Sequence, residues 1–380
     1  MNDKIWLSSP HMGGNERQYV KEAFDTNWVA PLGPNVDGFE KDIASFLQDD
    51  VYVSVLSSGT AAIHLALIIL GIKAGDEVIC QSMTFSASAN PIRYLGATPV
   101  FIDSENETWN MNPLFLETAI KDRMQRGKKP RAIIAVHLYG MPAKMDEITS
   151  IAKKYDIPII EDAAEALGSS ILGKKCGTFG DLGILSFNGN KIITTSGGGA
   201  LVSKKKSYVN QATFLSTQAR DPATHYQHSQ IGYNYRMSNI CAGIGRGQME
   251  VLPERIEQRK ANFNFYEKKL KDIPGISFLY EPSGFFSNRW LTTILVDPNK
   301  SGEITREKIR LELEKENIES RPLWKPMHLQ PVFKDFPYYG STISETLFEN
   351  GLCLPSGSNL AEEELNRILA GISNSIYRYS

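Results

Sequence analysis

The chain has 380 residues, a formal net charge of −2, 42% hydrophobic residues and 22% charged residues. This length suits one large and one smaller domain, and the composition is typical of a soluble globular protein. The basic runs Lys128–Lys129 and Lys204–Lys206 are short, so they indicate solvated surface and not a nucleic-acid partner. The four cysteines show no C-x-x-C pair and no metal-ligand spacing, which predicts free thiols in a cytoplasmic protein and no metal site.

The N-terminal segment Met1–Trp6 lacks the charged-then-apolar layout of a signal peptide. The most hydrophobic run, Ala61–Leu70, is too short to cross a membrane, which takes about 20 residues. We therefore expect no membrane partner and a helix buried on nearly every side. His64 interrupts this run, and we expect it to be a hydrogen-bonded core residue and not a catalytic group.

Short apolar runs alternate with helical patterns over residues 50–205. The expected strands are Val51–Leu56, Glu77–Gln81, Thr98–Ile102, Ala132–Leu138, Ile157–Glu161 and Gly183–Phe187. This alternation predicts an α/β fold with a mostly parallel sheet and helices on both faces. Ligands of such sheets bind outside the carboxyl ends of the strands, so polar residues at those ends are the first candidates for function.

The pattern weakens beyond this region. Gln218–Tyr235 is polar and aromatic, and predicts a long excursion from the fold. Glu250–Leu270 has the pattern of a long charged helix that leads into a second domain, so we expect a large domain over 1–250 and a small one over 251–380. The expected elements of the small domain are a strand near Trp290–Val296, a helix Thr305–Glu316 with Thr305 as its N-cap, and a terminal helix Ala361–Ile376.

Ser57-Ser-Gly-Thr60 joins the first expected strand to the buried helix. A helix N-terminus with small residues and a hydroxyl can bind an anion, because its free N–H groups and its dipole favour negative charge. The same residues taken alone are equally consistent with a helix cap. No Gly-Lys-Ser/Thr follows, and no strand-linked G-x-G-x-x-G is present, which disfavours P-loop and dinucleotide enzymes.

An amine and a carboxylate stand at the ends of two expected strands. Asp162 follows Ile157–Ile160, and Lys191 follows Gly183–Phe187 and precedes a glycine-rich stretch. Pyridoxal phosphate enzymes need this pair, an amine for the Schiff base and a carboxylate for the pyridine nitrogen. Asp162 alone is also consistent with a helix cap, Lys191 with a surface residue, and Phe85 with core packing as well as with ring stacking. The order of these features along the chain favours the cofactor site.

In four motifs the chain resembles the fold-type I pyridoxal phosphate enzymes. It is most similar to the sugar aminotransferases of the DegT/DnrJ/EryC1/StrS family. The motifs are Ser57-Ser-Gly-Thr-Ala-Ala62, Glu161-Asp-Ala-Ala-Glu-Ala-Leu-Gly168, Ser186-Phe-Asn-Gly-Asn-Lys191 and Gly232-Tyr-Asn-Tyr-Arg-Met-Ser-Asn239. The resemblance covers essentially the whole chain and implies an aspartate aminotransferase-like large domain with a smaller C-terminal α/β domain. The stretch Arg321–Gln330 is similar to the branch that makes UDP-4-amino-4,6-dideoxy-N-acetylhexosamines, the bacillosamine type.

The resemblance implies a role for each matching residue. Lys191 would form the Schiff base with pyridoxal 5′-phosphate, and Asp162 would bond the pyridine nitrogen. The other implied cofactor contacts are Gly59, Thr60 and Ser186 at the phosphate, Phe85 on the ring face, Glu165 near the ring 3-hydroxyl, Asn188, and Asn234 reaching the partner's phosphate across a homodimer interface. Trp28, Lys325 and His328 are the implied substrate contacts.

The implied reaction moves the amino group of L-glutamate to C4 of a UDP-linked 2-acetamido-2,6-dideoxy-4-keto-hexose, for surface glycan or glycoprotein biosynthesis. Related dehydratases carry His in place of Lys191, which disfavours dehydration. The alternatives are a dTDP- or GDP-linked 3- or 4-keto sugar as substrate, and a non-catalytic pyridoxal phosphate-binding regulator. Such regulators usually carry an added DNA-binding segment, and none is expected here.

Overall fold

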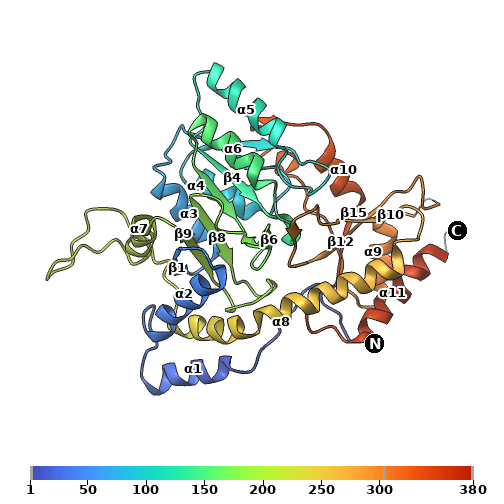
Figure 1. The fold of residues 1–380 in the computed structure, drawn as a ribbon, viewed down its shortest axis with the longest axis horizontal. Helices are drawn as coiled ribbons and strands as arrows, with labels where there is room; N and C mark the ends of the chain where they lie inside the picture. Colours follow the sequence, from blue (N-terminus) through green and yellow to red (C-terminus); the bar gives the residue numbers. More distant parts are fainter. Residues whose placement is uncertain (1–2, 303, 378–380) are drawn as a thin grey trace.

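The computed structural model describes residues 3–302 and 304–377, so Met1 and Asn2 of the N-terminal segment lie outside the described residues. The main sheet (Figure 1) has the strand order β1 (Tyr52–Leu56), β9 (Gly199–Ser203), β8 (Leu182–Ser186), β5 (Ile159–Asp162), β4 (Ala132–Val136), β2 (Glu77–Gln81), β3 (Thr98–Ile102) and β14 (Tyr338–Tyr339). Neighbouring strands are parallel except where β9 pairs antiparallel with β1 and β8. The expected mostly parallel sheet is confirmed.

Helices cover both faces of this sheet, as the alternating pattern predicted. Val78 and Cys80 of β2 belong to a buried cluster with α3 (Gly59–Ile69) and α7 (Lys206–Ser216). Ile79, which points to the opposite face, packs in a cluster with α5 (Pro113–Gln125) and α6 (Met145–Tyr155). The sheet is therefore an internal layer, and its polar residues reach a ligand only at the strand ends.

The buried helix α3 is confirmed, and so is the structural role of His64. This side chain is 7% exposed, and its Nδ1 lies 3.3 Å from the hydroxyl of Tyr235. Its ring also makes edge contacts with Tyr94 and Tyr233. These contacts account for a histidine in an otherwise apolar helix.

The long helix α8 (Asn239–Leu270) begins well before the expected Glu250. In the view of Figure 1 it runs below the region of the main sheet and on to the C-terminal elements. Ser238 caps it by accepting hydrogen bonds from the N–H groups of the next turn. Its glycines allow close packing, because a Cβ on Gly245 would lie 2.6 Å from the Phe39 ring. Close contact with α1 (Glu16–Asp25) and α2 (Pro34–Leu47) therefore offsets the low helix propensity of this glycine-rich stretch.

A smaller sheet lies in the C-terminal part of the chain. It has the order β10 (Ile276–Phe278), β12 (Thr292–Val296), β15 (Gly351–Leu354) and β13 (Arg321–Pro322). Helices α9 (Arg306–Lys315) and α11 (Glu362–Tyr377) pack on it, and the hydroxyl of Thr305 caps α9 by accepting from the Lys308 N–H at 3.2 Å. The remaining elements are α4 (Asn90–Tyr94), α10 (Ile343–Asn350), and a three-stranded sheet of β11 (Phe285–Phe286), β6 (Ser170–Ile171) and β7 (Lys174–Lys175).

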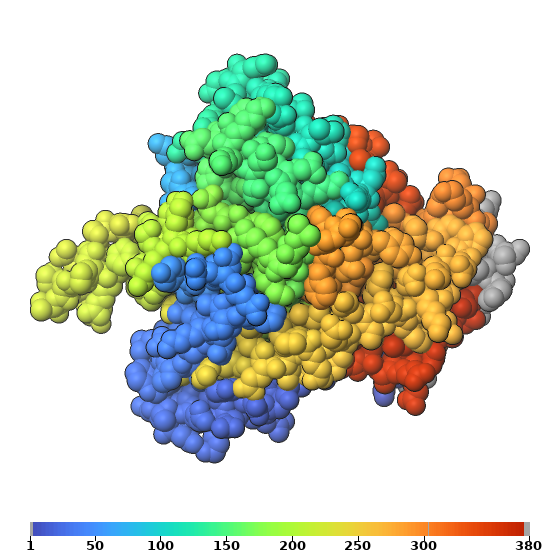
Figure 2. All heavy atoms as spheres, in the orientation of Figure 1, coloured from blue at the N-terminus to red at the C-terminus, as the bar shows by residue number. Residues whose placement is uncertain are grey.

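The expected excursion after α7 is an extended arm that projects from one side of the molecule (Figure 2). Between Gln218 and Tyr235 it contains neither helix nor strand, and an isolated bridge from Thr217 to Asn234 closes its base. Among the described residues, no helix is both long enough and apolar enough to span a membrane.

Candidate active site

A pocket of about 410 Å³ opens at the carboxyl ends of β5 and β8, beside the start of α3. Segments far apart in the sequence form its wall. The lining residues used below are Gly59, Thr60, Phe85, Ser88, Asp162, Glu165, Ser186, Asn188, Asn190, Lys191, Trp290 and Trp324. Eight of the residues predicted to contact the cofactor therefore line this pocket. They are Gly59, Thr60, Phe85, Asp162, Glu165, Ser186, Asn188 and Lys191.

The N-terminus of α3 forms one end of the pocket. Ser58 caps the helix by accepting from the Ala61 N–H at 3.0 Å. The N–H groups of Gly59 and Thr60 precede the first intrahelical bonds, so they can bind a ligand. A Cβ on Gly59 would lie 3.2 Å from the Cβ of Ser186, so glycine is what lets the two hydroxyl-bearing segments meet.

Asp162 is the last residue of β5 and is 5% exposed. One carboxylate oxygen accepts a hydrogen bond from the Ser88 hydroxyl at 2.6 Å, and the other accepts from the Ala164 N–H at 3.2 Å. These two bonds fix the orientation of the carboxylate at the pocket wall.

Lys191 lies in the loop after β8. Its Nζ is 4.3 Å from the centroid of the Trp290 ring and 3.7 Å from Oε1 of Glu165. The other oxygen of Glu165 accepts from the Tyr139 N–H at 2.7 Å. Burial raises the pKa of Glu165 above its usual value, although the nearby Lys191 amine opposes this shift.

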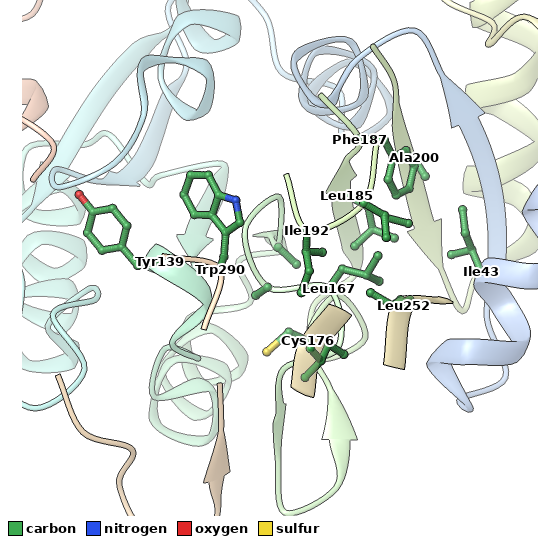
Figure 3. Packing of buried hydrophobic residues seen from close by; sticks show 14 of the residues in the cluster. Ile43, Tyr139, Leu167, Cys176, Leu185, Phe187, Ile192, Ala200, Leu252 and Trp290 are labelled. Atoms are coloured by element: carbon green, nitrogen blue, oxygen red, sulfur yellow. The ribbon is translucent and has the colours of Figure 1, made fainter. Parts of the chain in front are cut away.

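The backbone at Tyr139 is held in a left-handed conformation with φ of +55°. Its ring is nearly parallel to two tryptophan rings, tilted by 12° from Trp290 with centroids 6.4 Å apart, and by 18° from Trp324 with centroids 6.1 Å apart. Figure 3 shows Tyr139 beside Trp290 at the edge of the buried cluster. Strained backbone of this kind persists only where its surroundings fix it, and the Glu165 carboxylate is one such contact here.

The residue before Asp162 in β5, Glu161, has a buried carboxylate. Glu161 is fully buried and accepts from His137 Nε2 at 2.7 Å and from the N–H groups of Phe179 and Gly180 at 2.8 and 3.0 Å. The Ala143 N–H donates to His137 Nδ1 at 2.9 Å, so the ring proton is on Nε2 and faces Glu161. This cluster is saturated by hydrogen bonds and anchors the end of β5.

Four predicted residues lie outside this pocket. Asn234 is exposed at the base of the arm, Lys325 is exposed, and Trp28 lines a separate surface hollow with Pro34 and Arg246. His328 stacks on Tyr338 at 3.8 Å and contacts the Ser82 hydroxyl at 2.7 Å. The chain alone therefore does not bring these four residues to the pocket.

Four residues of the site were missed by sequence reasoning: Ser88, Tyr139, Trp290 and Trp324. The first three carry no local signal, because only tertiary structure brings them to Lys191 and Asp162. Trp324 lies inside the recognised stretch Arg321–Gln330 and could have been found there.

The comparisons with known proteins agree with this geometry. The model of the DegT/DnrJ/EryC1/StrS aminotransferase family matches residues 10–373. The chain belongs to this family. It is therefore a pyridoxal phosphate-dependent sugar aminotransferase, as the sequence motifs predicted.

Three individual proteins illustrate the similarity. The chain is 52% identical to EpsN of Bacillus subtilis (strain 168), named as a candidate pyridoxal phosphate-dependent aminotransferase, over 97% of this chain and 95% of EpsN. It is 38% identical to the GDP-perosamine synthase of Escherichia coli O157:H7, over 97% and 98% of the two chains. The pyridoxal phosphate form of Spr1654 from Streptococcus pneumoniae, named as a candidate sugar aminotransferase, matches with a TM-score of 0.89 at 27% identity over 100% of both chains.

The donor set of the pocket fits pyridoxal 5′-phosphate. A phosphate needs N–H and hydroxyl donors, which Gly59, Thr60 and Ser186 offer at one end. A pyridine nitrogen and an aldehyde need a carboxylate and an amine, which Asp162 and Lys191 offer within the same pocket.

Proposed function

We propose that the aminotransferase moves the amino group of L-glutamate to C4 of a nucleotide-linked 4-keto-6-deoxy sugar. The observation that carries this proposal is the meeting of Lys191, Asp162 and the α3 N-terminus in one pocket beside an aromatic wall. Aromatic faces suit the apolar side of a sugar ring as well as a cofactor ring.

When bound, pyridoxal phosphate supplies an electron sink for the charge that develops as a proton leaves carbon. In the proposed roles, Gly59, Thr60 and Ser186 bind the phosphate, and Phe85 covers the ring. Asp162 would keep the ring nitrogen protonated, because a carboxylate stabilises that positive charge, and the hydrogen bonds from Ser88 and Ala164 would hold the carboxylate in place. The Nζ of Lys191 would take the proton from the α-carbon of glutamate and deliver it to the cofactor C4′, and in the second half-reaction would carry a proton from that carbon to C4 of the sugar.

For the nucleotide, we propose a UDP-linked 2-acetamido sugar, and the support is the similarity of Arg321–Gln330 to that branch. A GDP-linked sugar is the second candidate, because a relative 38% identical to this chain is a GDP-perosamine synthase. Trp28, Lys325 and His328 remain the proposed substrate contacts, and the proposed assembly is a homodimer with shared active sites.

One panel experiment separates these substrates. The purified enzyme is incubated with glutamate and with UDP-, GDP- and dTDP-linked keto-sugars, and products are identified by mass and proton NMR. We expect an amino sugar from the UDP-linked 4-keto substrate. Product from the GDP-linked sugar alone would establish the second candidate instead.

The amino donor has its own test. Glutamate added without any sugar should produce 2-oxoglutarate and bleach the yellow pyridoxal phosphate form within minutes. An enzyme that stays yellow with glutamate would rule out this donor. Such a result would also favour the alternative function, a non-catalytic regulator that binds pyridoxal phosphate.

A further inference from the structure

The amine of Lys191 lies between an aromatic face and a carboxylate. Its Nζ is 4.3 Å from the centroid of the Trp290 ring and 3.7 Å from Oε1 of Glu165. An indole face and a carboxylate both attract a positive charge. The side chains of Lys191 and Glu165 are 13% and 6% exposed, so solvent ions screen this attraction weakly.

Trp290 is fixed so that its ring stays beneath the amine. Its indole N–H donates to the carbonyl of Asn190 at 2.8 Å, directly before Lys191 in the chain. Its own carbonyl accepts a hydrogen bond from Arg259, and the Tyr139 ring lies parallel to it. The same side chain therefore holds the loop of Lys191 and offers a face to its amine.

Glu165 is fixed with one oxygen turned toward Lys191. The Tyr139 N–H donates a hydrogen bond to the other oxygen at 2.7 Å. The side-chain amide of Asn288 donates to the backbone carbonyl of Glu165 at 3.0 Å. The titratable groups that face Glu165 besides Lys191 are Asp162, the Tyr139 phenol and the Cys353 thiol. Burial raises the pKa of both Tyr139 and Cys353, so these two groups stay neutral near pH 7.

We propose that Trp290 and Glu165 form a seat to which the Lys191 ammonium returns whenever the amine is not bonded to the cofactor. The proposal rests on the proposed function, because an aminotransferase frees its lysine in each half-reaction. Once the freed amine has taken the proton from the substrate carbon it is an ammonium, and holding that ammonium close to the site keeps its proton available for the next transfer. Trp290 acts here as a positioning residue.

The test measures how fast Lys191 reacts with acetic anhydride in protein stripped of cofactor. Trace labelling is read by peptide mass spectrometry and normalised to an exposed lysine such as Lys21. Trp290→Leu should raise the labelling rate about fivefold, because the aromatic face is lost. Glu165→Gln should raise it similarly, because the carboxylate that attracts the Lys191 amine is gone.

Two variants serve as matched controls. Trp290→Phe keeps an aromatic face and should label at close to the wild-type rate. Ser8→Ala removes a second donor to the Asn190 carbonyl, bonded at 2.7 Å, and an acceptor for Arg259 at 2.9 Å, but leaves Trp290 and Glu165 unchanged, so it should also label like the wild type.

Wild-type labelling in both Trp290→Leu and Glu165→Gln would overturn the seat. Labelling of Trp290→Phe as fast as Trp290→Leu would overturn it too, because loss of the indole N–H bond to Asn190, and not loss of the aromatic face, would then explain the effect. If circular dichroism shows that Trp290→Leu does not fold, Glu165→Gln decides the outcome. No sugar is present in this assay, so a failed sugar panel beside the expected labelling would overturn the proposed substrate and leave the seat standing.

Discussion

At the scale of single residues, the reaction depends on the amine of Lys191. Lys191→Ala should abolish turnover and the absorbance of the covalently bound cofactor, because no other lysine lines the described pocket. Lys191→Arg is the matched control, since it keeps a positive charge but forms no such bond. Measurable turnover in Lys191→Ala would refute the assignment of this lysine.

Asp162 should affect the chemistry more than the binding of the cofactor. In Asp162→Ala we expect the rate of the glutamate half-reaction to fall at least about 100-fold, while some pyridoxal phosphate still binds. Ser88→Ala removes the 2.6 Å hydrogen bond to this carboxylate, together with a 2.8 Å bond between the Ser88 and Thr84 hydroxyls, and should cost about tenfold. Stopped-flow absorbance with glutamate measures both rates, and equal rates in Asp162→Ala and wild type would contradict the role.

Glu161 should contribute stability that acid removes. Burial raises the pKa of this carboxyl, but hydrogen bonds from His137 and the backbone outweigh burial and hold the pKa below its ordinary 4.5. A lowered folded-state pKa gives stability that is fully present above the unfolded pKa and is lost as the pH falls through the folded pKa.

Glu161→Gln should therefore reduce the free energy of unfolding by about 2–3 kcal/mol at pH 7. The difference from wild type should shrink as the pH falls below the ordinary 4.5. Urea unfolding at several pH values measures it. A difference that grows in acid would show that the sign is wrong.

At the scale of elements, the start of α3 depends on a backbone contact with β9. A Cβ on Gly199 would lie 2.4 Å from both the Gly59 nitrogen and the Ser58 carbonyl carbon. Gly199→Ala should therefore cost about 2 kcal/mol of stability and weaken cofactor binding, because the N–H groups of the helix start are displaced. Gly197→Ala, in the same glycine run, meets no atom within 4 Å and should unfold at the wild-type temperature.

The elements also show what the sequence could and could not predict. Strands such as β2 and β3 match their expected bounds, because their apolar runs are buried on both faces. β9 was not expected, since glycines precede it, and α8 was expected to begin later because glycines carry low helix propensity. In both places close packing decided the structure.

Some residues of the active site could likewise be predicted from the sequence, and others could not. Lys191 and Asp162 could be predicted because each follows an apolar strand whose end is fixed by the fold. Trp290 could not, since it comes from the C-terminal part of the chain and reaches Lys191 only in the folded protein, where it bonds Asn190 and packs on Tyr139. The contacts that Trp290 and Glu165 make with the Lys191 amine depend on tertiary structure.

At the scale of the whole molecule, the projecting arm fits the proposed homodimer with shared sites. Tyr226 and Ile231 on this arm are 79% and 84% exposed, so both apolar side chains are open to contact with a partner. Asn234 at its base would reach the partner's phosphate. Asn234→Asp should therefore greatly weaken cofactor binding, because it would place a carboxylate against that phosphate.

Mixing two inactive variants tests this arrangement. Lys191→Ala and Asn234→Asp each disable every site of their own dimers. A mixed dimer regains one intact site, so equal subunit mixing after mild denaturation should restore about a quarter of wild-type activity. Activity that stays at the background level in the mixed sample would show that each chain completes its own site.

The strand β14 carries a consequence for how the protein is made. Tyr338–Tyr339 pairs with β3, although some 235 residues separate the two strands. A ribosome delivers the N-terminal strands first, so β3 waits with an open edge until the chain is nearly finished. An unpaired edge invites pairing with other nascent chains. A chain that ends before residue 338 should therefore aggregate more than the full chain, in which β14 covers this edge of β3.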